Sequence, residues 1–196
     1  IFVYFKYICF IFFNYNKFMA KIRLLTILLM PLFGICNDIS IEIRIAEQRL
    51  YVLQGPQKIS SYAISSSSYG EGSVANSFKT PLGMHSIQSM IGDGAETYSI
   101  FKARINTQRR AKVIHEHIDT DNDFVTSRIL WLTGEEPGKN SGTGIDSYSR
   151  YIYIHGTQEE GLIGSKASHG CIRMFNEDVI RLYDIVKKGT KVNILI

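Results

Sequence analysis

The stretch SHGCIRM at residues 168–174 places a cysteine between a histidine, a glycine and an arginine. Gly170, directly before Cys171, lets the backbone adopt unusual dihedral angles and approach a bound molecule closely. Backbone N–H groups in such a turn can point at one spot, as an oxyanion hole requires. Arg173 adds positive potential, which lowers the pKa of a thiol and can bind a carboxylate. The stretch therefore predicts a reactive cysteine in an anion-binding turn.

The cysteine count supports this interpretation. The chain has three cysteines, Cys9, Cys36 and Cys171, and we expect the first two to lie in a leader that is removed. Only Cys171 would then remain, so no intramolecular disulfide can form. A free thiol in an exported protein is open to oxidation, which makes it a candidate reactive group. The alternative is a small buried core residue, a common role of free cysteine.

Residues 19–36 have the layout of a secretory signal. Lys21 and Arg23 precede an apolar run, and Gly34 and Cys36 stand at the positions that a signal peptidase reads. We therefore expect cleavage near Cys36 and export to the periplasm or cell envelope.

This interpretation makes Met19 the true start and residues 1–18 upstream sequence, so that residues 1–36 form the leader and residues 37–196 the mature protein. Two alternatives stay open. Both apolar runs together could form a transmembrane anchor. Cys36 could carry a lipid, although Ile35 is larger than the residue that should precede such a site.

Charge separates the leader from the rest. The whole chain has 22 basic and 18 acidic residues and a net charge of +4. Residues 1–36 hold four of the basic residues and no acid, so residues 37–196 are neutral. A neutral chain gives no support to nucleic-acid binding. Its 160 residues fit one domain, which we expect to be a monomer.

The pattern of residues 37–196 predicts a mainly β domain. The segment ISIEIRI at 39–45 alternates apolar and polar residues, and with RLYVLQG it predicts a hairpin over 39–54. Further strands are predicted at 58–67, 80–92, 97–105, 111–118, 125–132, 150–156 and 190–196. One helix is expected after Asn176, which can cap it, with Val179, Leu182 and Val186 on its apolar face.

A cysteine nucleophile needs a base, a group that orients the base, and donors for the oxyanion. His155 ends a predicted strand sixteen residues before Cys171, and a loop of that length can bring the two side chains together. These residues alone leave a purely structural role for both open.

Other polar residues are weaker candidates. His115 and His117 would share one face of a strand and could begin a metal site, but no further ligand follows at a recognisable spacing. We interpret them as a polar strand face and His85 as a strand residue. The pair Glu159 and Glu160 is interpreted as solvated loop charge.

Together, IHGT at 154–157 and SHGCIRM at 168–174 resemble the signature of the L,D-transpeptidase catalytic domain family (YkuD-like). The segment KTPLG at 79–83 resembles the strand entry of that family. The resemblance spans residues 39–196 and implies a β-sandwich-like domain with mixed sheets.

The resemblance also implies roles for single residues. Cys171 would be the nucleophile, His155 the general base, and the carbonyl of Gly156 the group that orients the imidazole. Backbone N–H groups of Gly170 and Cys171 would form the oxyanion hole. Ser168, His169 and Arg173 would line the site. For Arg173, binding of a stem carboxylate and structural support of the loop before the helix both stay open.

The implied reaction is acyl transfer on peptidoglycan. Cys171 would attack the carbonyl of the third residue of a tetrapeptide stem, release D-alanine and form a thioester. Attack on the thioester by an amine of a second stem would form a 3→3 cross-link. Attack by a lysine of an envelope lipoprotein would tether that protein to the wall. Attack by water would make the enzyme an L,D-carboxypeptidase. The thiolate and oxyanion hole would suffice, with no metal or organic cofactor. A catalytically silent wall-binding protein is the alternative from another class; a cysteine redox protein is disfavoured because no resolving cysteine would remain.

Overall fold

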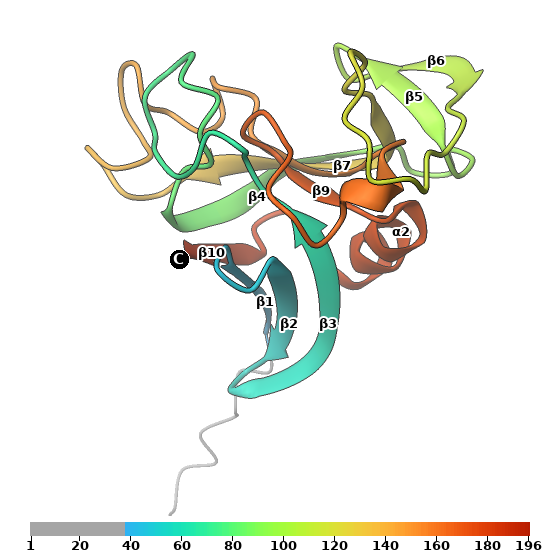
Figure 1. The fold of residues 1–196 in the computed structure, drawn as a ribbon. Helices are drawn as coiled ribbons and strands as arrows, with labels where there is room; N and C mark the ends of the chain where they lie inside the picture. The colour runs from blue at the N-terminus through green and yellow to red at the C-terminus, as the bar shows by residue number, and fades with distance from the viewer. Residues whose placement is uncertain (1–37) are drawn as a thin grey trace, which may run out of the picture. The chain divides into compact units, whose positions relative to one another are not determined.

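The computed structural model of the chain describes residues 38–196 (Figure 1). The predictions for the leader, residues 1–36, lie outside these residues. In the part that is described, the chain forms strands, one short 3-10 helix and one α-helix. None of the helices in residues 38–196 is long and apolar enough to cross a membrane. The prediction of a mainly β domain is confirmed.

The strands occur in the following order. They are β1 Ile39–Arg44, β2 Arg49–Gln54, β3 Gln57–Ser65, β4 Gly83–Ile91, β5 Ser99–Lys102, β6 Ile105–Arg110, β7 Val125–Gly134, β8 Tyr153–Gly156, β9 Ile172–Met174 and β10 Lys191–Leu195. The 3-10 helix η1 spans Glu160–Leu162, and the α-helix α2 spans Asn176–Ile185.

All ten strands belong to one sheet, in the order β4-β10-β1-β2-β3-β9-β8-β7-β5-β6. An additional pairing between β4 and β7 closes eight of them into a barrel-like ring, with the β5–β6 hairpin attached outside it through β7. Most neighbours are antiparallel, but β1–β10 and β8–β9 are parallel. The expected mixed pairing is therefore present within a single closed sheet.

One apolar cluster fills the fold. Alternate residues of β1 and β2, among them Ile41, Ile43 and Leu50, are buried, as the period-two pattern predicts. The helix α2 packs against β7 and β8 and contributes Val179 and Leu182, both fully buried. The expected apolar face of the helix is confirmed.

Three local predictions are wrong. Residues 111–118 form a loop, because Val113 and Ile114 are only half-buried and find no strand partner. Residues 97–105 contain a hairpin turn at Ala103 and Arg104, both with positive φ, instead of one strand. The helix begins at Asn176 itself, and Phe175 occupies the N-cap position without a side-chain cap.

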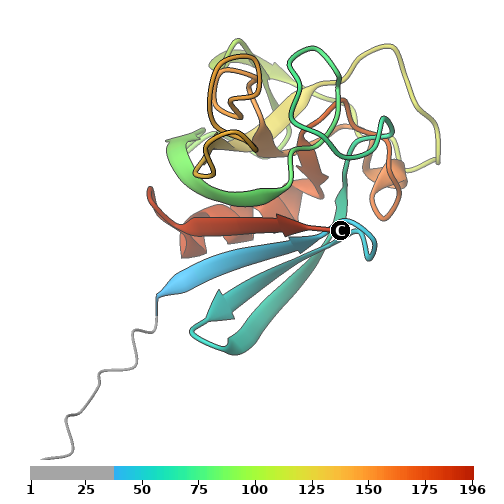
Figure 2. The ribbon, with the colours of Figure 1, turned by 90° about the vertical axis from the view of Figure 1, so that its left-hand side faces the viewer.

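The loops gather at one end of the domain. Figures 1 and 2 show the segments 66–82 and 135–152 on the side opposite to the β2–β3 turn. The strands β8 and β9 lie between β7 and β3, and the loop 157–171 that joins them runs at this end. The predicted site residues lie on or beside these two strands.

Candidate active site

The parallel pair β8–β9 places Cys171 and His155 on one face. Ile154 pairs with Ile172, and His155 pairs with Arg173. By the same register Cys171 lies beside Tyr153, two residues before His155. Side chains two residues apart on a strand point to the same face. The thiol and the imidazole are therefore diagonal neighbours over the same strand pair.

The imidazole of His155 is held by its own strand. Its Nδ1 lies 2.7 Å from the carbonyl oxygen of Gly156. A carbonyl oxygen can only accept, so Nδ1 carries the proton and Nε2 has the free lone pair. His155 is buried, and burial lowers its pKa although Asp123 acts in the opposite direction. A neutral imidazole of this tautomer is suited to take a proton.

The thiol of Cys171 lies in a partly buried pocket of backbone groups. The N–H of Tyr153 points to Sγ at 3.4 Å, and Sγ lies 3.4 Å from the carbonyl oxygen of Tyr151. Burial raises the pKa of Cys171 to about 12, and the positive charge of Arg173 offsets only part of this effect. Arg173 lowers the pKa of the thiol, as expected, but burial has the larger effect. A base must therefore remove the proton for the thiol to react.

The turn at 168–171 is held by Ser168. Its hydroxyl donates to the Cys171 carbonyl oxygen at 2.6 Å and accepts from the Gly170 N–H at 3.3 Å. Gly170 has a φ of +117°, which favours glycine, and Thr80 Oγ1 donates to its carbonyl at 3.0 Å. Because the Gly170 N–H already has an acceptor, an oxyanion would have to replace that long bond.

Arg173 lies inside the protein rather than at the site surface. Its side chain is 1% exposed, and it forms ion pairs with Glu159 at 2.9 Å and with Asp123 at 2.8 Å. A side chain so enclosed has no path to a substrate carboxylate. The burial favours the structural role among the two that the sequence left open.

The interpretation of Glu159 and Glu160 as solvated loop charge is wrong. The side chain of Glu159 is fully buried, and it accepts hydrogen bonds from Thr120 as well as from Arg173. Glu160 is 10% exposed and accepts from the backbone and side-chain nitrogens of Asn176. The pair holds the loop 157–171 to its surroundings instead of facing water.

Asp123 links this buried network to the surface. Its Oδ2 lies 3.1 Å from Nδ1 of His169, which packs against the exposed rings of Tyr69 and Phe78. The sequence offered no signal for Asp123, because it lies in an irregular loop fifty residues before Arg173. His169 is thus a rim residue, tied to the arginine beneath the site.

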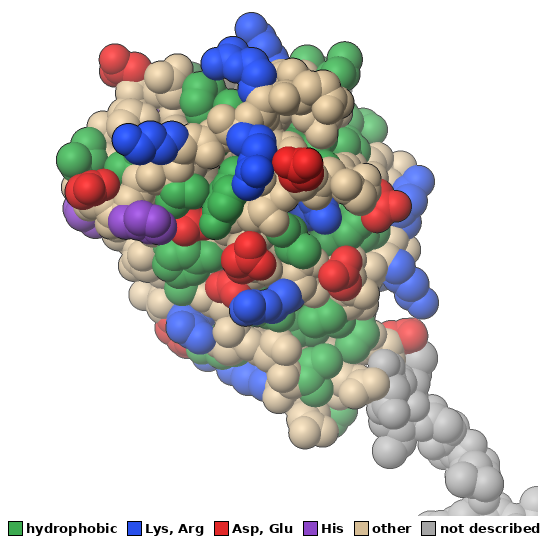
Figure 3. All heavy atoms as spheres, turned by 90° about the vertical axis from the view of Figure 1, so that its right-hand side faces the viewer, with side chains coloured by type: hydrophobic (Ala, Val, Ile, Leu, Met, Phe, Trp, Pro, Cys, Tyr) green, Lys and Arg blue, Asp and Glu red, His purple; other side chains and the backbone are tan. Residues whose placement is uncertain are grey.

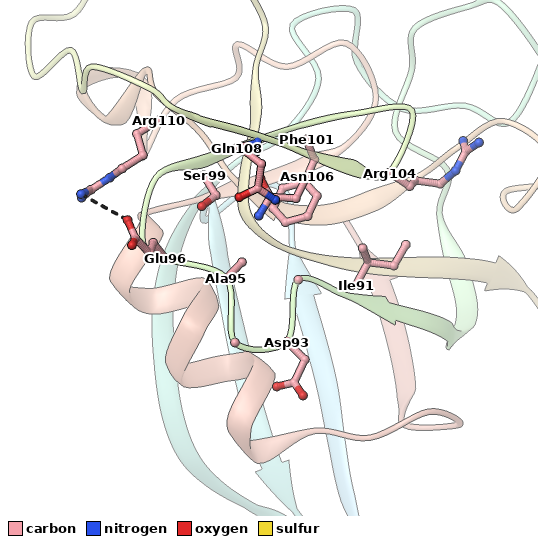
Figure 4. Close-up of a pocket in the computed structure, with 12 residues that line it drawn as sticks. Ile91, Asp93, Ala95, Glu96, Ser99, Phe101, Arg104, Asn106, Gln108 and Arg110 are labelled. Carbon is pink, nitrogen blue, oxygen red and sulfur yellow. Dashed lines mark hydrogen bonds and ion pairs between the residues drawn. The ribbon is translucent and has the colours of Figure 1, made fainter.

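Two cavities are lined in part by residues from the surroundings of the thiol. One, of about 300 Å³, is lined by Phe78, Arg150, Tyr151 and His169, among others. The other, of about 560 Å³, lies between the β5–β6 hairpin and the loop 92–96 (Figure 4). Phe101 lines this second cavity and belongs to the apolar cluster that Cys171 packs against. Each cavity thus shares residues with the surroundings of the thiol, although Cys171 itself lines neither.

The remaining histidines lie elsewhere. His115 and His117 are exposed in the loop 111–118, and His85 is buried in β4 between Gly83 and Ser147. Within residues 38–196, no group of three metal-ligating side chains could hold an ion. On the face in Figure 3, basic and acidic side chains are interspersed.

A mainly β domain with a cysteine and an oriented histidine on one strand pair has the arrangement of a thiol-dependent acyltransferase. The model of the YkuD family, described as L,D-transpeptidase catalytic domain, matches residues 38–194. The chain therefore belongs to the L,D-transpeptidase catalytic domain family.

Individual relatives agree with this assignment. YkuD of Bacillus subtilis, named as an L,D-transpeptidase, is 49% identical over 59 residues, which are 30% of this chain and 36% of that protein. YcfS of Escherichia coli, named likewise, is 34% identical over 61 residues, 31% of this chain and 19% of that protein. These matches span about a third or less of the relatives' length. An L,D-transpeptidase from Mycobacterium smegmatis shares the fold at a TM-score of 0.52 and 16% identity, over 81% of this chain and 59% of that one.

Proposed function

We propose that the protein is an exported L,D-transpeptidase that acts on tetrapeptide stems of peptidoglycan through a thioester. The observation that carries the proposal is the shared face of Cys171 and His155, with the imidazole oriented by Gly156. Family membership supports the substrate class.

The proposed reaction has two steps, acylation of the thiol and transfer of the acyl group to an acceptor. In the first, His155 Nε2 takes the proton of Cys171, and Sγ attacks the carbonyl carbon of the third stem residue. The C–N bond to D-alanine breaks, and the proton passes to the leaving amine. In the second, an acceptor amine gives a proton to His155 and attacks the thioester carbonyl carbon; the C–S bond breaks, and Sγ takes the proton from His155 to restore the thiol.

Three molecules could accept the acyl group from the thioester. An amine of a second stem would give a 3→3 cross-link, and a lipoprotein lysine would give a tethered protein. Water would give hydrolysis, the activity of an L,D-carboxypeptidase. Family membership favours transfer, because the matched family is that of the L,D-transpeptidases.

The test is mass spectrometry of the products that the purified protein forms from a disaccharide-tetrapeptide. We expect free D-alanine, a thioester on Cys171 and cross-linked dimers. Tripeptide without dimers would assign hydrolysis instead. Neither thioester nor D-alanine release would contradict the proposal, and Cys171→Ala supplies the background.

A further inference from the structure

The geometry points to Arg104, at the turn of the β5–β6 hairpin, as the residue that binds the C-terminal carboxylate of the donor stem. This inference rests on the proposed function, because it assumes that a tetrapeptide stem is the donor. Because Arg173 is buried, that carboxylate needs another cation, and Arg104 contacts Tyr153, a residue whose backbone lies against the thiol.

The hairpin turn projects Arg104 over a shelf of aromatic rings. Its guanidinium carbon lies 4.9 Å from the ring centre of Trp131 and 5.0 Å from that of Tyr151. Its Nη1 donates to the Tyr153 hydroxyl at 3.4 Å. Stacking of this kind holds a guanidinium in place while the edge of its plane stays available for hydrogen bonds.

Two of the residues whose side chains contact Arg104 also contact the thiol through their backbones. The N–H of Tyr153 and the carbonyl oxygen of Tyr151 each lie 3.4 Å from Cys171 Sγ. The shelf that holds the guanidinium therefore belongs to the residues that form the pocket of the nucleophile. Arg104 lines the larger of the two cavities, and Tyr151 beneath it lines the smaller one.

Among the described residues, Arg104 has no carboxylate partner, in contrast to Arg173 and Arg110. Across residues 38–196, no carboxylate lies within ion-pair distance of Arg104. Arg173 is paired with Asp123 and Glu159, and Arg150 donates to the carbonyls of Gly72 and Lys79. At the far end of the larger cavity Arg110 is paired with Glu96 (Figure 4). Within this part of the chain, Arg104 and Arg150 thus both lack a carboxylate partner, but the guanidinium of Arg150 is already held by two backbone carbonyls.

The leaving D-alanine supplies the carboxylate that fits best. Its carboxylate lies one residue beyond the attacked carbonyl, and consecutive residues are separated by about 3.8 Å. Arg104 is separated from the thiol by the side chain of a single tyrosine, Tyr153. The carboxylates of the glutamyl and diamino acid residues are attached to the acyl side of the scissile bond and stay with the thioester. Arg104 is therefore expected to act before D-alanine leaves.

The experiment compares donors that differ by one carboxylate. The full chain is incubated with a tetrapeptide stem whose C-terminus is a carboxylate or a carboxamide, and thioester formation on Cys171 is timed. Two further donors carry the amide on the glutamyl or on the diamino acid residue. The variants are Arg104→Gln, Arg104→Lys and, as the matched control, Arg109→Gln, an exposed arginine of the same hairpin.

We expect Arg104→Gln to slow acylation by the C-terminal acid about 10- to 100-fold, the size of one charge-assisted bond. The C-terminal amide should react slowly with the parent protein and no more slowly with this variant. Arg104→Lys should recover part of the rate, and Arg109→Gln should match the parent. The inference would be overturned if Arg104→Gln slowed acylation equally with the acid and the amide donor. It would also be overturned if the parent protein reacted equally fast with both donors. The same holds if only amidation of the glutamyl or of the diamino acid residue slowed acylation. A parent protein that forms no thioester with any donor would overturn the proposed function as well.

Discussion

Asp123 Oδ2 lies 2.8 Å from Nη2 of Arg173, and the same oxygen lies 3.1 Å from Nδ1 of His169. One carboxylate thus connects a fully buried arginine on β9 to an exposed histidine in the turn before the thiol. Arg173 in turn pairs with His155 in the register of β8 and β9. The turn at 168–171 is therefore held from beneath by an ionic network rather than by apolar packing alone.

Loss of Arg173 should unfold the protein more easily. Arg173→Met would leave Glu159 buried without its cation, a change that costs about 3–5 kcal/mol in the free energy of unfolding. Urea unfolding measures this cost. The double variant Arg173→Met/Glu159→Gln should recover part of it, because the unpaired charge is gone. If Arg173→Met instead kept its stability and lost only acylation by stem peptide, Arg173 would be a substrate ligand after all.

Asp123→Asn should change how stability depends on pH. Burial alone would raise the pKa of Asp123, but Arg173, His155 and the bond to His169 outweigh it and lower the pKa. A carboxyl whose pKa is lower in the folded state stabilises the fold above its unfolded pKa of about 3.9, and this contribution is lost as the pH falls through the folded value.

The difference in unfolding free energy between the parent and Asp123→Asn should therefore be constant at pH 5 to 7, within about the uncertainty of the extrapolation, and shrink in more acidic solution. Urea unfolding at a series of pH values measures it. A difference that grows on acidification would contradict the assigned direction. Asp121→Asn, in the same loop, is the control.

Much of the fold can be predicted from the local sequence pattern, but the ionic network around Arg173 cannot. Alternation identifies β1 and β2 because one face of each is buried. The same alternation misleads at residues 111–118, where no neighbouring strand covers the apolar residues. The turn at Ala103 and Arg104 lacks glycine, so its positive φ values have no sequence signal.

The candidate site likewise contains residues that the sequence identifies and residues that only the structure identifies. Cys171 and His155 stand out because their residue types and spacing suggest chemistry within one short segment. Asp123 and Glu159 do not, because their roles depend on which loops meet beside Arg173. A charged residue in a loop usually faces water, and only the tertiary structure identifies the buried exceptions.

His155→Ala should abolish most turnover while the domain stays folded. Removal of a general base typically slows a reaction by about 10²–10⁴-fold. Thioester formation with a tetrapeptide stem measures the loss, and His115→Ala, an exposed histidine of the loop 111–118, is the matched control. Equal inactivity of a folded His115→Ala would mean that the wrong histidine is assigned. Cys171→Ala should form no thioester.

The thiol itself should respond to pH as a buried group. Burial raises the pKa of Cys171 to about 12, so the thiolate fraction of Cys171 is small at neutral pH. Only the thiolate reacts with iodoacetamide, and below its pKa the thiolate fraction rises about tenfold per pH unit. The alkylation rate should therefore increase steadily from pH 7 to about 10 without a plateau.

Mass spectrometry of the peptide that contains Cys171 measures this rate separately from Cys9 and Cys36, and Cys171→Ser gives the blank. In the proposed acylation reaction His155 would remove the same proton within the bound complex, so turnover should not need the alkaline pH that alkylation needs. A plateau of alkylation near pH 7 would instead show a thiolate paired with a protonated His155. In that case acylation would begin from an ion pair, and His155→Ala would slow alkylation as strongly as it slows acylation.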